Sequence, residues 1–147
     1  MQSSALIECF KAYYRDFSAQ PLTQLDQIYS PQTGFRDPIH QLSGREELKR
    51  YFASTSQGLD HCRFEFRHQI VNESNAFFSW VMHYAHPRIK GGKALKLDGA
   101  TQIRFTDQVL YHEDFYDMGA MLYQHLPVIG WAVRSINQRL MHEAVEQ

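Results

Sequence analysis

The chain has 147 residues, enough for one domain that buries roughly 70% of the surface its unfolded form exposes. Its 15 basic and 16 acidic residues nearly cancel, so no overall charge favours nucleic acid or an anionic membrane as a partner. No apolar run is long enough to span a bilayer, and the first ten residues lack the pattern of a signal peptide. We therefore expect a cytoplasmic protein with a single domain over residues 1–147.

Two amphipathic helices are predicted at the start of the chain. Apolar residues recur every three or four positions from about Ser4 to Phe17, which is typical of a helix with one buried face. A second helix follows Pro21, because proline is favoured at the first helical position. Pro31 and Gly34 are expected to end this second helix.

A short strand and a third helix come next. The strand carries Phe35 to Asp37, and the aspartate is held in extended backbone because Pro38 disfavours the helical region for the residue before it. Ser43 and Glu46 have the spacing of a capping box, which predicts the start of a helix. The buried stripe of this helix is formed by Leu48, Tyr51 and Phe52. Asp37 is thereby placed where its carboxyl group can enter a cavity between helices and sheet.

Beyond Gly58 the apolar period changes from that of a helix to that of a strand. Alternation with polar residues predicts a half-buried strand, whose inward side consists of Phe64, Phe66, His68 and Ile70. Turns separate three further strands, at about residues 76–86, 95–106 and 109–116. Three helices followed by a four-stranded antiparallel meander predict an α+β fold in which the sheet curls over the helices.

The last part of the chain, residues 126–147, is predicted to be a helical extension of the domain. Its apolar positions at helical spacing are Ile129, Val133, Ile136 and Leu140. Two placements of this segment stay open. It would either cover the opening of a cavity as a lid or pack on a dimer face.

The arrangement of two helices, the Asp37 strand and a downstream sheet resembles the nuclear transport factor 2-like superfamily, which includes ketosteroid isomerases and SnoaL-like polyketide cyclases. The run from His112 to Asp117, His-Glu-Asp-Phe-Tyr-Asp, is also similar to a run that many SnoaL-like proteins carry. The resemblance implies a cone, with three N-terminal helices packed in a strongly bent antiparallel sheet and a small-molecule pocket between them.

The resemblance also implies catalytic roles. Tyr13 and Asp37 are separated as the catalytic tyrosine and aspartate of ketosteroid isomerases are, which makes Asp37 the general base and Tyr13 a donor to the oxyanion. The protonated aspartate of those isomerases falls on Thr101, whose hydroxyl cannot replace a carboxylic acid. Protonated Asp114 or His112 is the candidate for the missing donor.

The alternation of side chains along strands identifies the rest of the predicted pocket. If Thr101 faces inward, its strand and the two neighbouring strands turn further side chains toward the helices, and Arg104 faces out. His112 and Asp114 then share the inward side of the last strand. The residues expected to contact a substrate are Trp80, Met82, Tyr84, Thr101, Phe105 and Tyr116.

Simpler explanations exist for several of these residues. Asp37 is also typical of an aspartate that bonds its own turn, and Tyr14 competes with Tyr13 for the inward position. His83 and His86 would point to opposite faces of a strand, so no metal site is expected, and Asp117 is better suited to cap a helix.

Three functions fit these observations. The first is a cofactor-free isomerase- or cyclase-like enzyme that takes a proton from the carbon next to a carbonyl group in a hydrophobic substrate. The second is a domain that binds a hydrophobic small molecule without catalysis. The third is an interaction domain, which uses the outer face of the sheet to form a homodimer or to bind another partner.

Overall fold

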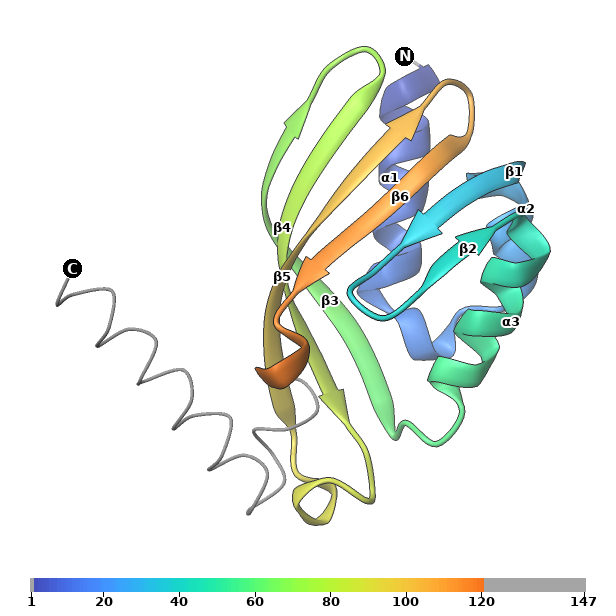
Figure 1. Ribbon diagram of the computed structural model, residues 1–147. Coiled ribbons are helices and arrows are strands. Elements are labelled where there is room, and N and C mark those ends of the chain that lie inside the picture. The colour runs from blue at the N-terminus through green and yellow to red at the C-terminus, as the bar shows by residue number, and fades with distance from the viewer. Residues whose placement is uncertain (1, 121–147) are drawn as a thin grey trace, which may run out of the picture.

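The computed structural model describes residues 2–120, and the predicted C-terminal helix lies outside these residues. Six strands form one curled sheet in the order β2-β1-β6-β5-β4-β3 (Figure 1). β1 and β6 run parallel, and every other neighbouring pair is antiparallel. The strands are β1 (Tyr29–Arg36), β2 (Gln41–Ser43), β3 (His61–Val71), β4 (Asn75–Ala85), β5 (Leu95–Phe105) and β6 (Val109–Tyr116).

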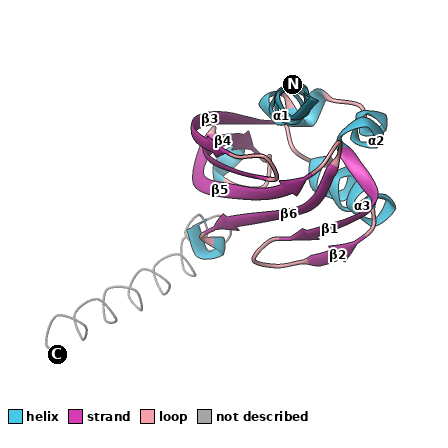
Figure 2. Ribbon diagram, turned by 90° about the horizontal axis from the view of Figure 1, so that it is seen from above, coloured by secondary structure: helices cyan, strands magenta, loops and turns pink. Residues whose placement is uncertain are grey.

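The helices lie on one side of this sheet (Figure 2). Short 3-10 turns at Phe17–Ala19 and Leu22–Gln24 connect the first two helices, and a third such turn, Lys90–Gly92, joins β4 to β5. The α-helices are α1 (Gln2–Arg15), α2 (Leu25–Ile28) and α3 (Arg45–Ser56). Within the described residues, no helix has the length and apolar character needed to cross a membrane.

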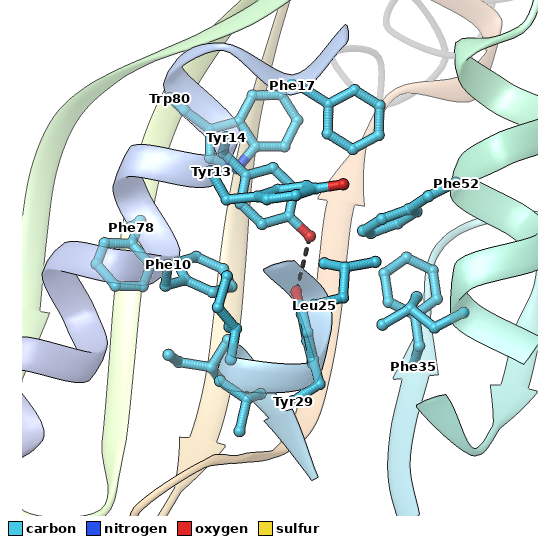
Figure 3. Close-up of a cluster of buried hydrophobic side chains, with 14 of the residues drawn as sticks. Phe10, Tyr13, Tyr14, Phe17, Leu25, Tyr29, Phe35, Phe52, Phe78 and Trp80 are labelled. Atoms are coloured by element: carbon cyan, nitrogen blue, oxygen red, sulfur yellow. Dashed lines mark hydrogen bonds between the residues drawn. The ribbon is translucent and has the colours of Figure 1, made fainter. Parts of the chain in front are cut away.

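An aromatic core joins the helices to the sheet (Figure 3). On α1, Phe10 and Tyr13 are almost completely buried, and the Phe10 ring stacks on Phe78 of β4 with ring centroids 5.4 Å apart. Burial of such rings is the main apolar contribution to stability in a domain of this size. The core extends along α1 and reaches Tyr29 at the start of β1.

The structure confirms the predicted α+β fold. The first and third helices and the four-stranded antiparallel meander form where the apolar patterns place them, and β6 has the predicted bounds. As expected, Arg104 is exposed, while Ile103 and Phe105 on either side of it along β5 are buried. β1 and β2 extend the predicted meander to six strands.

The second helix is shorter than predicted, and Pro31 does not end it. The helix stops at Ile28, and Pro31 lies inside β1. The pairing of β1 with β6 shifts between Tyr29 and Gly34, so the ladder is irregular where the proline lies. A strand tolerates proline where the partner strand needs no N–H donor.

The predicted capping box is also wrong. α3 begins after Gly44, whose φ of +95° favours glycine, and Ser43 belongs to β2. The side chain that reaches back is that of Glu47, because its carboxylate accepts a hydrogen bond of 2.8 Å from the backbone N–H of Ser43. Glu46 instead lies 3.5 Å from the ammonium group of Lys49.

The alternation predicted for β3 breaks in the middle of the strand. Phe66 pairs with Trp80, but the next paired residue is His68, so Arg67 forms a bulge. Past the bulge, His68 is exposed and the Ile70 side chain is 76% exposed. One extra residue reverses the faces of all later side chains, which is why Ile70 does not reach the core.

Candidate functional site

A cavity of about 210 Å³ lies between the helices and the inner face of the sheet. Its wall is mostly apolar and aromatic, which suits a hydrophobic small molecule. Two carboxylates, those of Asp37 and Asp114, also belong to this wall. The apolar part of the wall includes Phe17, Phe52, Phe64, Trp80, Met82 and Tyr84.

Asp114 has one oxygen held by the protein and one free. Its Oδ1 accepts a 2.6 Å hydrogen bond from the Thr101 hydroxyl and lies 2.7 Å from His112 Nε2. Among the described residues, none is hydrogen-bonded to Oδ2. The Asp114 side chain is 17% exposed, whereas the His112 side chain is fully buried. The arrangement fixes the carboxylate and leaves one oxygen available to a ligand in the cavity.

His112 continues this hydrogen bonding away from the cavity wall. Its Nδ1 lies 2.7 Å from the Tyr29 hydroxyl, and that hydroxyl lies 2.7 Å from the hydroxyl of Tyr14 (Figure 3). The imidazole ring packs between aromatic rings, with the Phe35 centroid at 4.9 Å and the Phe10 centroid at 5.5 Å. Burial is the first cause that raises the pKa of Tyr14 and of Tyr29 well above the ordinary value.

Thr101 connects Asp114 to the tryptophan of β4. Trp80 Nε1 donates a 2.8 Å hydrogen bond to the Thr101 hydroxyl, which in turn donates to Asp114. The indole ring lies directly over Gly99, where a Cβ atom would approach Trp80 Cη2 to 2.2 Å. Gly99 therefore allows the tryptophan to pack flat on β5 and to reach the threonine.

Asp37 accepts hydrogen bonds from the backbone of its own turn, which is the simpler of the two roles that the sequence predicts. Its Oδ1 accepts hydrogen bonds from the backbone N–H groups of Ile39, at 2.8 Å, and His40, at 2.6 Å. Its Oδ2 accepts a hydrogen bond from the Tyr51 hydroxyl. The Asp37 side chain is 2% exposed, so both of its oxygens are occupied although the residue belongs to the cavity wall.

Two tyrosines of the wall lie near both carboxylates. The pKa of Tyr51 and the pKa of Tyr116 are raised, first by burial and further by the negative charges of Asp37 and Asp114. Both hydroxyls consequently stay protonated across the physiological range. The Tyr116 hydroxyl can donate a hydrogen bond to a ligand oxygen, whereas the Tyr51 hydroxyl already donates to Asp37.

The structure brings together most of the predicted site residues. Trp80, Met82, Tyr84 and Tyr116 belong to the cavity wall with Asp37 and Asp114. Thr101 and Phe105 are buried behind the wall and do not line it.

The tyrosines are arranged differently from the expected pattern. Tyr14 lines the cavity, and Tyr13 is not among the lining residues. The Tyr13 ring packs on Phe52 and Phe17, and burial raises the pKa of Tyr13 to about 12. Tyr29 falls within the second helix that the sequence predicts. No spacing rule indicates that β1 starts at this residue and that its hydroxyl lies next to His112.

Other polar residues of the sheet take structural roles. Asp117 caps the turn after β6, since its carboxylate accepts hydrogen bonds from the backbone N–H groups of Gly119 and Ala120. His83 pairs with Glu65 at 3.1 Å. Within residues 2–120, no group of three or more His, Cys, Asp or Glu side chains is arranged to hold a metal ion.

Comparison with known proteins gives a consistent result. The model of the SnoaL-like domain matches residues 10–113, and no curated protein matches the sequence. A protein with a ketosteroid isomerase-like fold from Catenulispora acidiphila, solved with trimethylamine, has a TM-score of 0.71 at 14% identity, covering 82% of this chain and 91% of its own.

Two further structures show the same fold. A protein assigned as a SnoaL-like polyketide cyclase from Shewanella putrefaciens has a TM-score of 0.70 at 15% identity, covering 82% of this chain and 93% of its own. AclR from Streptomyces galilaeus, assigned as a hydroxylase, has a TM-score of 0.66 at 17% identity, covering 96% of this chain and 95% of its own. At these identities the likeness concerns the fold alone.

Proposed function

Because the chain belongs to the SnoaL-like domain family, we propose that its cavity binds a hydrophobic carbonyl compound and removes a proton from the carbon next to the carbonyl group. The observation that supports this most directly is the half-free carboxylate of Asp114 in an aromatic cavity. The reaction would be an isomerase- or cyclase-like step without a cofactor.

Asp114, rather than Asp37, is the general base in this proposal. A base needs a free lone pair within reach of the substrate, and the Oδ2 atom of Asp114 has one. Both oxygens of Asp37 already accept hydrogen bonds, so this residue holds Tyr51 and the turn before β2. Family resemblance predicts the general base at Asp37, whereas this proposal places the general base at Asp114 on β6.

The negative charge that develops on the carbonyl oxygen needs hydrogen-bond donors. The wall offers the hydroxyls of Tyr14 and Tyr116, since the hydroxyl of Tyr51 already donates to Asp37. The raised pKa values of Tyr14 and Tyr116 keep them as donors, and a preorganised donor in an apolar cavity stabilises an oxyanion more strongly than water does. The rings of Trp80 and Tyr84 would hold the apolar part of the substrate.

The proposal can be tested with 2-tetralone, a compact aromatic ketone with acidic hydrogens next to its carbonyl group. The rate at which these hydrogens exchange with D2O, followed by proton NMR, is compared with the rate in buffer alone. We expect the protein to accelerate the exchange and Asp114→Asn to lose about 100-fold or more of that acceleration. Exchange no faster than in buffer would remove the support for proton abstraction from such ketones.

A second candidate function is self-association through the outer face of the sheet. Phe77 of β4 and Phe115 of β6 are each 45% exposed, and Ile70, which pairs with Phe77, is 76% exposed. Their strand positions turn them away from the cavity, so they form an apolar patch open to a partner. We propose a homodimer in which two copies cover this patch, compatible with a ligand-binding or a catalytic cavity.

A further inference from the structure

Four polar side chains form one continuous hydrogen-bonded chain whose two ends belong to the cavity wall. Tyr14 is bonded to Tyr29, Tyr29 to His112 Nδ1, and His112 Nε2 to Asp114 Oδ1, each at 2.7 Å. Tyr14 and Asp114 line the cavity, whereas Tyr29 and His112 have no exposed surface behind it. We call this series the Tyr14–Asp114 chain.

We propose that the Tyr14–Asp114 chain is a proton relay, in which Asp114 accepts a proton from the substrate carbon while Tyr14 gives one to the carbonyl oxygen. This inference rests on the proposed function and deepens it. Tyr14 becomes a second catalytic residue, the acid that pairs with the base Asp114. Tyr29 and His112 are positioning residues, because they act only through the two ends of the chain.

The protons balance if the resting chain holds a protonated His112 and an ionised Asp114. The bond from substrate carbon to hydrogen breaks, and that proton goes to Asp114 Oδ2. Tyr14 gives its proton to the carbonyl oxygen, Tyr29 gives its own to Tyr14, and Nδ1 of His112 gives its own to Tyr29. The products are an enol, a neutral Asp114 and a neutral His112 that keeps its Nε2 proton.

The reverse sequence completes an isomerisation. If the substrate has a carbon–carbon double bond next to the carbon that loses the proton, the enol is a dienol, and Asp114 returns its proton to the far carbon of that double bond. The double bond moves into conjugation with the carbonyl group, which forms again as the hydroxyl proton of the dienol goes back to Tyr14. Tyr14 then passes a proton to Tyr29, and Tyr29 passes one to Nδ1, which restores the protonated His112. No other acid, base or oxidant is required, since every proton that leaves the substrate or the chain is returned.

Each ring nitrogen of His112 has an oxygen atom 2.7 Å away, so both N–H groups of a doubly protonated ring would have an acceptor. Asp114 is the charged group that contacts this ring, and the rings of Phe10 and Phe35 lie within the range at which aromatic rings attract a cation. The other titratable groups that face it are the hydroxyl of Tyr29 from β1 and, beyond it, that of Tyr14 from α1. Neither tyrosine needs to become a phenolate, because each receives a proton as it gives one.

The relay is tested with the exchange of 2-tetralone hydrogens in a double-mutant cycle. We expect Tyr14→Phe and Tyr29→Phe each to slow exchange by about 100-fold, and the double variant to be no slower than either, because parts of one relay are not additive. Tyr13→Phe is the matched control, since this neighbouring buried tyrosine is outside the chain. It should keep the rate of the unmodified protein.

A second measurement needs no substrate. Nitrogen-15 NMR of the histidine rings distinguishes a protonated ring from either neutral form. We expect the His112 ring to carry a proton on both nitrogens in the unmodified protein and in Tyr13→Phe, and to lose its Nδ1 proton in Tyr29→Phe. A folding defect alone would not move this signal selectively, and far-ultraviolet circular dichroism confirms that each variant is folded.

The outcomes separate the relay from the proposed function. If Asp114→Asn stops exchange while Tyr14→Phe and Tyr29→Phe remain fully active, Asp114 is the base and the relay is wrong. A neutral His112 from pH 5 to pH 8 also overturns the relay, because the proton that it passes on is missing. If the unmodified protein fails to accelerate exchange, the proposed function falls and the catalytic role of the relay falls with it.

Discussion

At the scale of single residues, Gly99 has the most demanding position in the sheet. A Cβ atom there would lie within 2.6 Å of three atoms of the Trp80 ring, which must shift or break its bond to Thr101. We expect Gly99→Ala to lower the free energy of unfolding by about 1–3 kcal/mol, the usual cost of overpacking a core. Urea denaturation measures the change.

Gly34 provides the matched control for this substitution. It also lies in a strand, but a Cβ atom at Gly34 would have no neighbour within 4 Å. Gly34→Ala should therefore leave the free energy of unfolding unchanged or raise it slightly. Equal destabilisation by the two alanines would show that the contact with the tryptophan does not explain the effect at Gly99.

The two cysteines differ in the reactivity that their surroundings allow. Cys9 is exposed on α1, whereas Cys62 is buried in the cavity wall, where burial raises the pKa of its thiol to about 12. At pH 8 the folded protein should react with one equivalent of iodoacetamide, and the unfolded protein with two. Mass spectrometry locates the label. Rapid labelling of Cys62 in the folded protein would contradict this burial.

At the scale of secondary-structure elements, an ion pair joins α2 to α3. Asp26 Oδ1 lies 2.5 Å from Lys49 Nζ and 3.1 Å from Arg45 Nε. The hydrogen bond from Lys49 is the first cause that lowers the pKa of Asp26 below its ordinary value of 3.8. The ionised carboxylate of Asp26 therefore stabilises the folded state above pH 3.8, its ordinary pKa. This stabilisation is lost as the pH falls through the lowered pKa of the folded protein.

The pH dependence of unfolding checks this pair. We expect Asp26→Asn to be slightly less stable than the unmodified protein at pH 6, since the pair is partly exposed and screened by solvent. The difference should shrink as the pH falls below 4 and the aspartate becomes protonated. A difference that stays constant down to pH 2 would mean that packing, not charge, accounts for it.

Much of the order of elements could be predicted from the sequence, and the exceptions have local causes. The alternation of apolar residues placed β4, β5 and β6 and the inward faces of Trp80 and Thr101. It failed in β3, because one inserted residue, Arg67, shifts the register. The sequence pattern carries no sign of a bulge of this kind.

The candidate site was predictable in part, because the alternation of side chains along a strand shows which of them share a face. Residues two apart on one strand, such as His112 and Asp114, were correctly placed on one face. Contacts between distant segments were not predictable, since the pairing of Tyr29 with His112 depends on β1 lying parallel to β6, a crossover that no spacing indicates. The choice between Tyr13 and Tyr14 likewise depends on the rotation of α1 against the sheet.

At the scale of the whole molecule, the outer face of the sheet determines the oligomeric state in our proposal. The apolar patch of Ile70, Phe77 and Phe115 would be covered by a second copy. We expect light scattering after size exclusion to give twice the mass of the chain, and Phe77→Glu with Phe115→Glu to give a folded monomer. A monomeric unmodified protein at high micromolar concentration would contradict the dimer.

The most direct test of the whole account compares the two carboxylates of the cavity. The exchange of 2-tetralone hydrogens is measured for Asp114→Asn and Asp37→Asn, each confirmed to be folded by circular dichroism. We expect Asp114→Asn to lose about 100-fold or more of the catalysed rate and Asp37→Asn to keep most of it, because only Asp114 has a free oxygen. Loss of exchange in Asp37→Asn with an active Asp114→Asn would contradict the account.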